Sequence, residues 1–231
     1  MKMKTLNEIM SFWGTDKRKV DHNYVPYYEE ILEDKRNKNL KLLEIGIYRP
    51  TQPEQDRPLG VWDGDRFDGD RRLPGASLRS WGEYLKNSEI YGIDVYDFKD
   101  VESENVKTFI CNQESREDMD ELLKSIGGEL DIIIDDGGHR MNQHQISLAT
   151  LFKYVKSGGH YVIEDLQTCK HPAYRNPGEY STVDILNNFK SDGKIKSNYM
   201  TREEEIYLEN NIKDFKINVN HQSGIVLIQK K

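Results

Sequence analysis

Two groups of acidic residues in the sequence could bind a metal ion and support proton transfer. The stretch IIIDDGGH ends an apolar run with Asp135 and Asp136 and continues to His139, whereas YVIED ends with Glu164 and Asp165. If the two runs are neighbouring strands, four carboxylates meet at one sheet edge, where their repulsion raises each pKa unless a cation neutralises them. Oxygen ligands suit Mg²⁺, Ca²⁺ or Mn²⁺ better than Zn²⁺. We therefore predict a divalent-metal site formed by Asp136, Glu164 and Asp165.

The same stretch offers a general base. His139 follows Asp136 by three residues, and an imidazole beside a metal could take the proton of a substrate hydroxyl. The metal would lower the pKa of that hydroxyl and fix its oxygen for attack. The sequence thus predicts His139 and Asp136 as catalytic residues. An alternative role for some of the acids is to cap helices or to form salt bridges.

Polar residues at two further strand ends could bind a nucleoside. In an open parallel sheet, ligands bind beyond the carboxyl ends of the strands. Asp94 ends the second predicted strand, where a carboxylate can accept two hydrogen bonds from ribose hydroxyls or, alternatively, cap the next helix. Asn112 and Gln113 follow the third strand, and their amides could bind an adenine edge or only close a turn.

Residues around the first strand could let the backbone approach a ligand closely. Glu44 and Gly46 end this strand, and Gly75 and Ser77 stand where the following helix begins. Glycine has no side chain to block a ligand at such a position. The chain has no G-x-G-x-x-G pattern, which disfavours a dinucleotide-dependent oxidoreductase.

Alternating apolar patterns predict the elements that hold these residues. We expect strands at 42–47, 90–94, 106–111, 130–135, 160–164, 214–219 and 224–229, and helices at 5–13, 23–38, 77–85, 116–125 and 143–154. The alternation indicates an α/β fold with a doubly wound, mostly parallel sheet and right-handed crossovers. The last two strands, joined by NHQS, are typical of an antiparallel hairpin.

Length, charge and composition limit the organisation and the partners. A chain of 231 residues favours a single domain, 1–231, in which residues 1–38 form N-terminal helices. Residues 50–74 hold four of the seven prolines, so we predict a long insertion loop there. The net charge of -7 disfavours binding to nucleic acid or anionic membranes. Without a secretory or membrane-spanning pattern, we expect a cytoplasmic protein with a small-molecule partner, and the apolar faces of the leading helices could form a homo-oligomer.

Several motifs together resemble a known enzyme family. GTDK followed by His22 and Tyr24, LLEIGI, GASLRSW, IYGIDV, DIIIDDGGH and LFKYVKSGGHYVIEDL span about two thirds of the chain. With them the chain resembles the class I S-adenosylmethionine-dependent methyltransferases, in particular the metal-dependent O-methyltransferases that act on sugars of macrolides of the macrocin and mycinamicin type. The resemblance implies a Rossmann-like methyltransferase sheet of order 3-2-1-4-5-7-6 with an antiparallel seventh strand.

The resemblance also implies cofactors and roles for individual residues. We expect S-adenosylmethionine as methyl donor, Mg²⁺ on Asp136, Glu164 and Asp165, and His139 as the base. The resemblance implies cofactor contacts at Glu44, Gly46, Ser77, Asp94 and Gln113. From their positions in the sequence, we also expect Lys17, Gly75, Asn112 and Asp135 to bind the cofactor.

One departure from the family concerns the region between the first strand and the next helix. In relatives the turn after EIG reaches G-x-S-L within a few residues, whereas residues 50–74 intervene here. We interpret this insertion as a lid over the acceptor site and 166–182 as a second acceptor-side loop. The predicted reaction is methylation of a hydroxyl on a sugar, a sugar-containing natural product or a surface glycan. Alternatives are a cephalosporin hydroxylase-like or other enzyme on the same cofactor-binding fold, and a non-catalytic cofactor-binding module.

Overall fold

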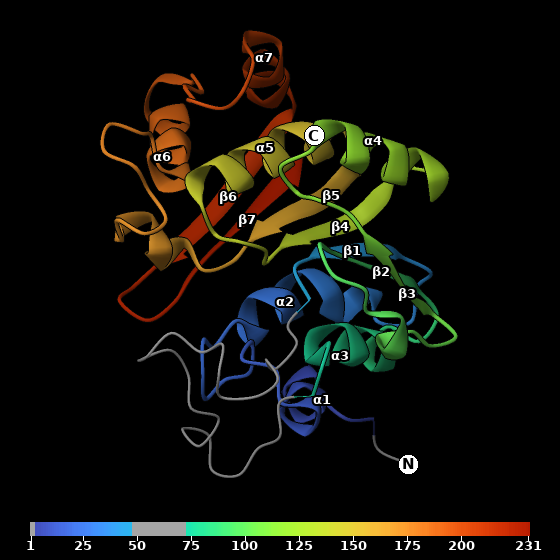
Figure 1. Cartoon of the computed structure of the whole chain (residues 1–231). Coiled ribbons are helices and arrows are strands. Elements are labelled where there is room, and N and C mark those ends of the chain that lie inside the picture. The colour runs from blue at the N-terminus through green and yellow to red at the C-terminus, as the bar shows by residue number, and fades with distance from the viewer. Residues whose placement is uncertain (1–2, 48–72) are drawn as a thin grey trace.

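A seven-stranded sheet forms the centre of the computed structural model, which describes residues 3–47 and 73–231. The strands are β1 Lys41–Ile45, β2 Glu89–Asp94, β3 Val106–Ile110, β4 Leu130–Asp135, β5 Val155–Ile163, β6 Ile212–Val219 and β7 Gly224–Lys230. Their order is β3-β2-β1-β4-β5-β7-β6, and β7 runs antiparallel to both β5 and β6 while the other neighbours are parallel (Figure 1). The expected fold class and strand order are confirmed.

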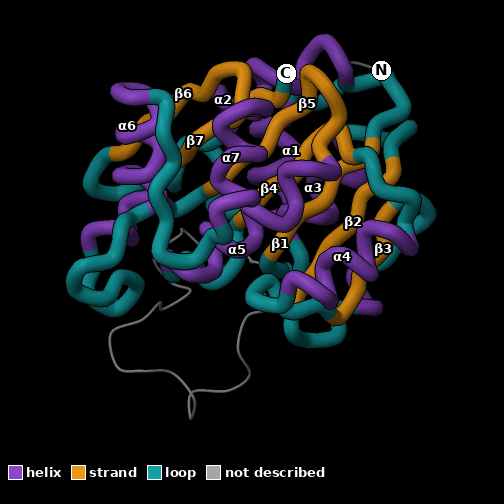
Figure 2. The backbone as a smooth tube through the Cα atoms, turned by 90° about the horizontal axis from the view of Figure 1, so that it is seen from above, coloured by secondary structure: helices purple, strands orange, loops and turns teal. Residues whose placement is uncertain are grey.

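Helices cover both faces of the sheet (Figures 1 and 2). One face carries α1 Leu6–Trp13, α2 Val25–Leu32 and α3 Ala76–Tyr84, and the other carries α4 Arg116–Ser125, α5 Met141–Leu151, α6 Thr182–Asp192 and α7 Arg202–Asn211. Short 3₁₀ segments are Glu33–Lys35, Lys99–Val101, Phe152–Tyr154 and Leu166–Lys170. None of the helices in the described ranges combines the length and the apolar character that crossing a membrane requires.

Successive residues of the central strands pack into two separate cores. In β4, Ile132 and Ile134 join the core under α1, α2 and α3, whereas Ile133 joins the core under α4 and α5. A strand directs successive side chains to opposite faces, so a strand covered by helices on both faces is apolar throughout. The apolar residues Ile132 to Ile134 therefore specify a central strand, and the partly exposed Asp136 comes directly after its end.

Three parts of the fold differ from the pattern expected from the sequence. β5 begins at Val155 rather than at 160, because a register irregularity against β4 accommodates the SGG stretch, in which Gly158 has a φ of +77°. The helices α6 and α7 were not expected. Both begin with capping boxes, formed by Ser181 with Asp184 and by Thr201 with Glu204, and this signal could have revealed them.

The predicted loops can be compared with the structure only in part. The predicted lid, residues 50–74, lies outside the described residues except for its last two positions. The predicted acceptor-side loop, residues 166–182, begins as the 3₁₀ segment Leu166–Lys170 and ends where α6 starts. The functions of both loops stay predictions.

Candidate functional site

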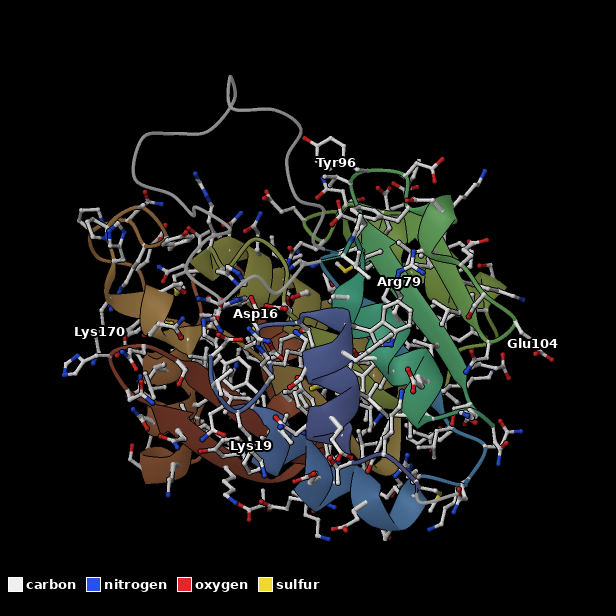
Figure 3. The ribbon with its side chains drawn as sticks, turned by 90° about the horizontal axis from the view of Figure 1, so that it is seen from below. Asp16, Lys19, Arg79, Tyr96, Glu104 and Lys170 are labelled. Carbon is white, nitrogen blue, oxygen red and sulfur yellow. The ribbon has the colours of Figure 1, made fainter. Side chains whose placement is uncertain are left out.

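A pocket of about 860 Å³ opens at the carboxyl ends of β1, β2 and β4. The chain runs outward from β1 to β2 and β3 on one side, and β4 begins the other side, so this is the point where the strand order reverses. In Figure 3, Tyr96 lies beyond the end of β2, and Asp16 lies in the loop after α1; both line the pocket. The volume is within the range of pockets that enclose a nucleoside-sized ligand.

Most of the residues that the sequence singled out lie around this pocket. The lining includes Lys17, Gly46, Ser77, Asp94, Asn112, Gln113, Asp136, His139 and Asp165. Glu44, Gly75, Asp135 and Glu164 are not part of the lining. The pocket thus unites residues from the loop after α1, from the start of α3 and from the ends of five strands, β1 to β5.

The residues behind the lining hold it in place. Glu44 is fully buried and accepts a hydrogen bond of 2.8 Å from the Ser77 hydroxyl. Asp135 is also fully buried and accepts hydrogen bonds from the hydroxyls of Ser147 and Tyr161. Burial raises the pKa of both carboxyls. In this structure, therefore, Glu44 and Asp135 face protein partners and support the pocket from behind.

Asp94 and Gln113 shape the pocket wall through backbone contacts. The Asp94 carboxylate accepts hydrogen bonds from the N–H groups of Ile47 at 2.8 Å and Tyr96 at 3.0 Å, which fixes the loops after β1 and β2. Gln113 accepts a 2.7 Å hydrogen bond from the N–H of Gly138. Gln113 thus closes a turn, as its alternative role predicted, whereas Asp94 binds loop N–H groups and does not cap the next helical segment, Lys99–Val101. Both side chains still border the pocket.

Gly46 permits the close approach of the β1 and β4 ends. Its φ is +89°, and a Cβ at this position would lie 2.2 Å from the Asp136 carbonyl oxygen. The Asp136 N–H also donates a 3.0 Å hydrogen bond to the Ile45 carbonyl. The glycine of LLEIGI is therefore required to place Asp136 at the pocket.

Replacing Gly46 by alanine should strongly destabilise the protein, and Gly178→Ala provides a matched control. Gly178 has a similar φ of +84° but nothing within 4 Å of the added Cβ, so it reports the backbone penalty alone. That penalty is about 1–2 kcal/mol, and the clash at Gly46 should add about 1–3 kcal/mol more. Urea unfolding of both variants measures the difference. Equal destabilisation would show that the β1 and β4 ends are not in contact as described.

Asp136, His139 and Asp165 form a cluster whose possible ligand atoms all lie within 4.8 Å of one another. The Nε2 of His139 is 3.4 Å from Oδ2 of Asp165. Both residues have left-handed backbone conformations, with φ values of +58° and +54°. Such conformations are unfavourable for residues with a side chain and are concentrated at functional sites. The cluster brings together two of the three predicted metal ligands and the predicted base.

The third predicted ligand, Glu164, points elsewhere. Its carboxylate is buried and accepts hydrogen bonds from the Lys17 ammonium at 2.8 Å and from the Tyr28 hydroxyl. The salt-bridge alternative considered for these acids therefore describes Glu164 in this structure. The prediction that Glu164 binds the metal is not tested by this structure and stays a prediction.

Lys17 is a buried cation among three carboxylates. Its ammonium lies 2.5 Å from Asp136 Oδ2, 2.8 Å from Glu164 Oε2 and 3.3 Å from Glu44 Oε1, and its side chain is 1% exposed. Burial alone would lower the pKa of Lys17, but the three carboxylates outweigh it and hold this pKa well above its ordinary value. Lys17 therefore carries a full positive charge at neutral pH.

His22 and Tyr24, which follow the GTDK motif, both contact Asp165. The sequence left open whether His22 faces a pocket or water, and it assigned no role to Tyr24. The Tyr24 hydroxyl lies 2.9 Å and His22 Nδ1 3.2 Å from Asp165 Oδ1. Burial alone would lower the pKa of His22, but the hydrogen bond and charge of Asp165 raise it above the ordinary value. Tyr24 and Tyr28 are four residues apart, a spacing that places both on one helix face. This spacing was the signal in the sequence that both tyrosines face the same site.

The donor set fits a divalent cation. Glu44, Asp136, Glu164 and Asp165 supply four carboxyl groups, which outnumber their cationic partners, the ammonium of Lys17 and the imidazole of His22. Carboxylate oxygens are the ligands that Mg²⁺ and Mn²⁺ prefer. In addition, Nδ1 of His139 is buried with no hydrogen-bond partner among the described residues. An added cation at Asp136 and Asp165 would compensate the excess charge.

Comparison with known proteins finds several O-methyltransferases that are similar to the chain, although no family model matches it. The chain is 34% identical to the mycinamicin VI 2''-O-methyltransferase of Micromonospora griseorubida over 170 residues, which are 73% of this chain and 38% of that enzyme. It is 33% identical to the demethylmacrocin O-methyltransferase of Streptomyces fradiae over 193 residues, 83% of this chain and 43% of that enzyme. The chain thus spans about two fifths of the length of these curated relatives.

A solved structure matches nearly the whole chain. The MycE methyltransferase of mycinamicin biosynthesis, in complex with Mg, S-adenosylhomocysteine (SAH) and mycinamicin VI, superposes with a TM-score of 0.76 at 27% identity. The match covers 99% of this chain and 55% of the MycE chain. The whole of the described sheet therefore has a counterpart within roughly half of a larger enzyme.

Proposed function

Because this chain belongs to the family of S-adenosylmethionine-dependent sugar O-methyltransferases, we propose that it methylates a hydroxyl group of a sugar or sugar-containing small molecule, with S-adenosylmethionine as methyl donor and Mg²⁺ as metal. The observation that carries the proposal is the cluster of Asp136, His139 and Asp165 at the edge of a nucleoside-sized pocket. The net charge of -7 supports a small-molecule acceptor over nucleic acid. Cytoplasmic location and homo-oligomerisation stay predictions from the sequence.

The pocket would bind the methyl donor between the ends of β1, β2 and β3. Asp94 borders the pocket after β2, and its carboxylate can accept hydrogen bonds from ribose hydroxyls in addition to the two backbone donors that it already binds. Asn112 and Gln113 follow β3 on the adjoining wall, where their amides can meet the base. When bound, S-adenosylmethionine supplies an activated methyl group whose bonding electron pair remains on sulfur after transfer.

His139 would act as the general base. The acceptor hydroxyl loses its proton to His139 Nε2 as its oxygen forms the new bond to the methyl carbon and the carbon–sulfur bond breaks. Asp165 Oδ2, 3.4 Å from Nε2, stabilises the imidazolium that results. Tyr24 and His22 keep the Asp165 carboxylate in this orientation. When held by Asp136 and Asp165, with Glu164 as the further predicted ligand, the metal supplies Lewis-acid activation and orientation of the acceptor oxygen.

Titration calorimetry with SAH, with and without Mg²⁺, tests the proposal together with a methyl-transfer assay on small glycosides. We expect SAH to bind and methyl transfer to require the metal. Binding without any transfer to glycosides would favour a non-catalytic module, and transfer that persists in excess chelator would contradict the metal-dependent reaction.

Replacing Asp94 by alanine should weaken cofactor binding first. Loss of a hydrogen bond to a charged group costs about 1.5–3 kcal/mol, which corresponds to roughly a 10- to 100-fold higher Kd for SAH. The measurement is calorimetric titration, and kcat at saturating donor should change much less. A large fall in kcat with unchanged Kd would show that Asp94 does not contact the cofactor.

A further inference from the structure

Lys17 divides the acidic groups of the site into two sets. Its ammonium bonds to Asp136, Glu164 and Glu44, whereas Asp136 also belongs to the cluster with His139 and Asp165. Asp136 is therefore shared by a resident cation and the candidate position of a divalent cation. Glu164, predicted as a metal ligand, is on the lysine side.

We propose that Lys17 is a resident counter-cation of the metal site, and that a divalent cation competes with its ammonium for the carboxylates of Asp136 and Glu164. The inference rests on the proposed function for the identity of the metal, but its evidence is the position of the lysine. In this role Lys17 neutralises the acids before the metal arrives and sets the affinity with which the metal binds. It is a positioning residue that acts through the carboxylates.

The backbone around Lys17 is fixed, whereas its ammonium can change partners. The Lys17 carbonyl accepts hydrogen bonds from the N–H groups of Tyr24 at 3.0 Å and Val25 at 3.2 Å, which anchors it at the start of α2. Lys17 also borders the pocket. An ammonium on a flexible four-carbon chain can therefore move towards the pocket or remain on Glu44, which lies outside the metal cluster.

Simple electrostatics gives the direction of the effect. Two cations that share a buried carboxylate repel each other, and this repulsion is weakly screened away from bulk water. Removing the charge of Lys17 should therefore strengthen binding of Mg²⁺, even though it weakens the protein without metal. A role for Lys17 in fold stability alone predicts no gain in metal affinity.

The test is the Kd for Mg²⁺, measured by calorimetry without methyl donor in the wild-type chain and in the variants Lys17→Met and Lys17→Gln. Glutamine can still donate hydrogen bonds to the carboxylates but carries no charge. We expect both variants to bind Mg²⁺ roughly tenfold or more tightly than the wild type, and Mg²⁺ to raise their Tm by more. Lys19→Met removes the same charge two residues away at an exposed position and should leave the Kd unchanged.

Each outcome of these measurements either supports or overturns the proposed role of Lys17. Unchanged or weaker Mg²⁺ binding in both Lys17 variants, beside a wild type that binds the metal, overturns the counter-cation role and leaves the proposed function intact. A wild type that binds no Mg²⁺ overturns the metal dependence itself. If neither variant folds even in saturating Mg²⁺, the metal cannot replace the ammonium and the inference is wrong; folding that requires Mg²⁺ supports it.

Discussion

The variant His139→Ala is expected to lose about two to four orders of magnitude in kcat, the typical contribution of a general base. Its imidazole stands at the pocket with Nε2 facing Asp165, and no other described histidine lies in the metal-ligand cluster. The Kd for SAH should remain close to that of the wild type, because the residues expected to bind the nucleoside lie at the ends of β2 and β3. Single-turnover methyl transfer and calorimetry measure the two quantities separately.

A matched control is His221→Ala, an exposed histidine in the turn between β6 and β7, which should retain full activity. The Mg²⁺ affinity of His139→Ala gives a further check, since a ring nitrogen of His139 belongs to the cluster of possible ligand atoms. A loss of Mg²⁺ affinity as large as the loss of kcat would make His139 a ligand and contradict its role as base.

The variant Asp165→Asn is expected to abolish metal binding and methyl transfer together. Loss of a partner that only orients a metal ligand already costs about 10- to 100-fold in affinity, so removing a ligand charge should raise the Kd for Mg²⁺ by more than about 100-fold. Asp165 also faces His139 and accepts hydrogen bonds from Tyr24 and His22. Asparagine keeps its shape, so the loss should arise from charge rather than from packing.

Calorimetric titration with Mg²⁺ and circular dichroism would separate loss of the site from loss of the fold. Asp34→Asn is the control, because its carboxylate is 72% exposed and lies on the surface after α2. Retention of wild-type Mg²⁺ affinity in Asp165→Asn would place the metal away from the described cluster and remove the observation on which the proposed reaction depends.

Several site residues could be predicted because local sequence determines them. The middle of a strand that is buried on both faces, here Ile132 to Ile134, must be apolar, so the acids Asp135 and Asp136 that come next mark the strand end. Parallel strands bring such ends to one edge, which is why Asp94, Asp136 and Asp165 were expected near each other and all border one pocket. The same reasoning placed Gly46, whose positive φ and contact with Asp136 only glycine tolerates.

The residues that each of these acids contacts could not be predicted in this way. Glu164 and Asp165 are neighbours in the sequence, yet one bonds to Lys17 and Tyr28 and the other faces His139 and His22. Lys17 meets Glu164 across 147 positions of the chain. No local pattern ranks contacts between residues so distant, because their distance depends on how α2 packs against the sheet.

By itself, the sequence determined the α/β class, the strand order through its resemblance, and the strand ends at which acids and glycines gather. Only the tertiary structure decided that the segment after α1 inserts a lysine, a histidine and two tyrosines among those acids. The physical reason is that periodicity and turn chemistry act over a few residues, whereas the charge balance of a buried site depends on every element packed against it.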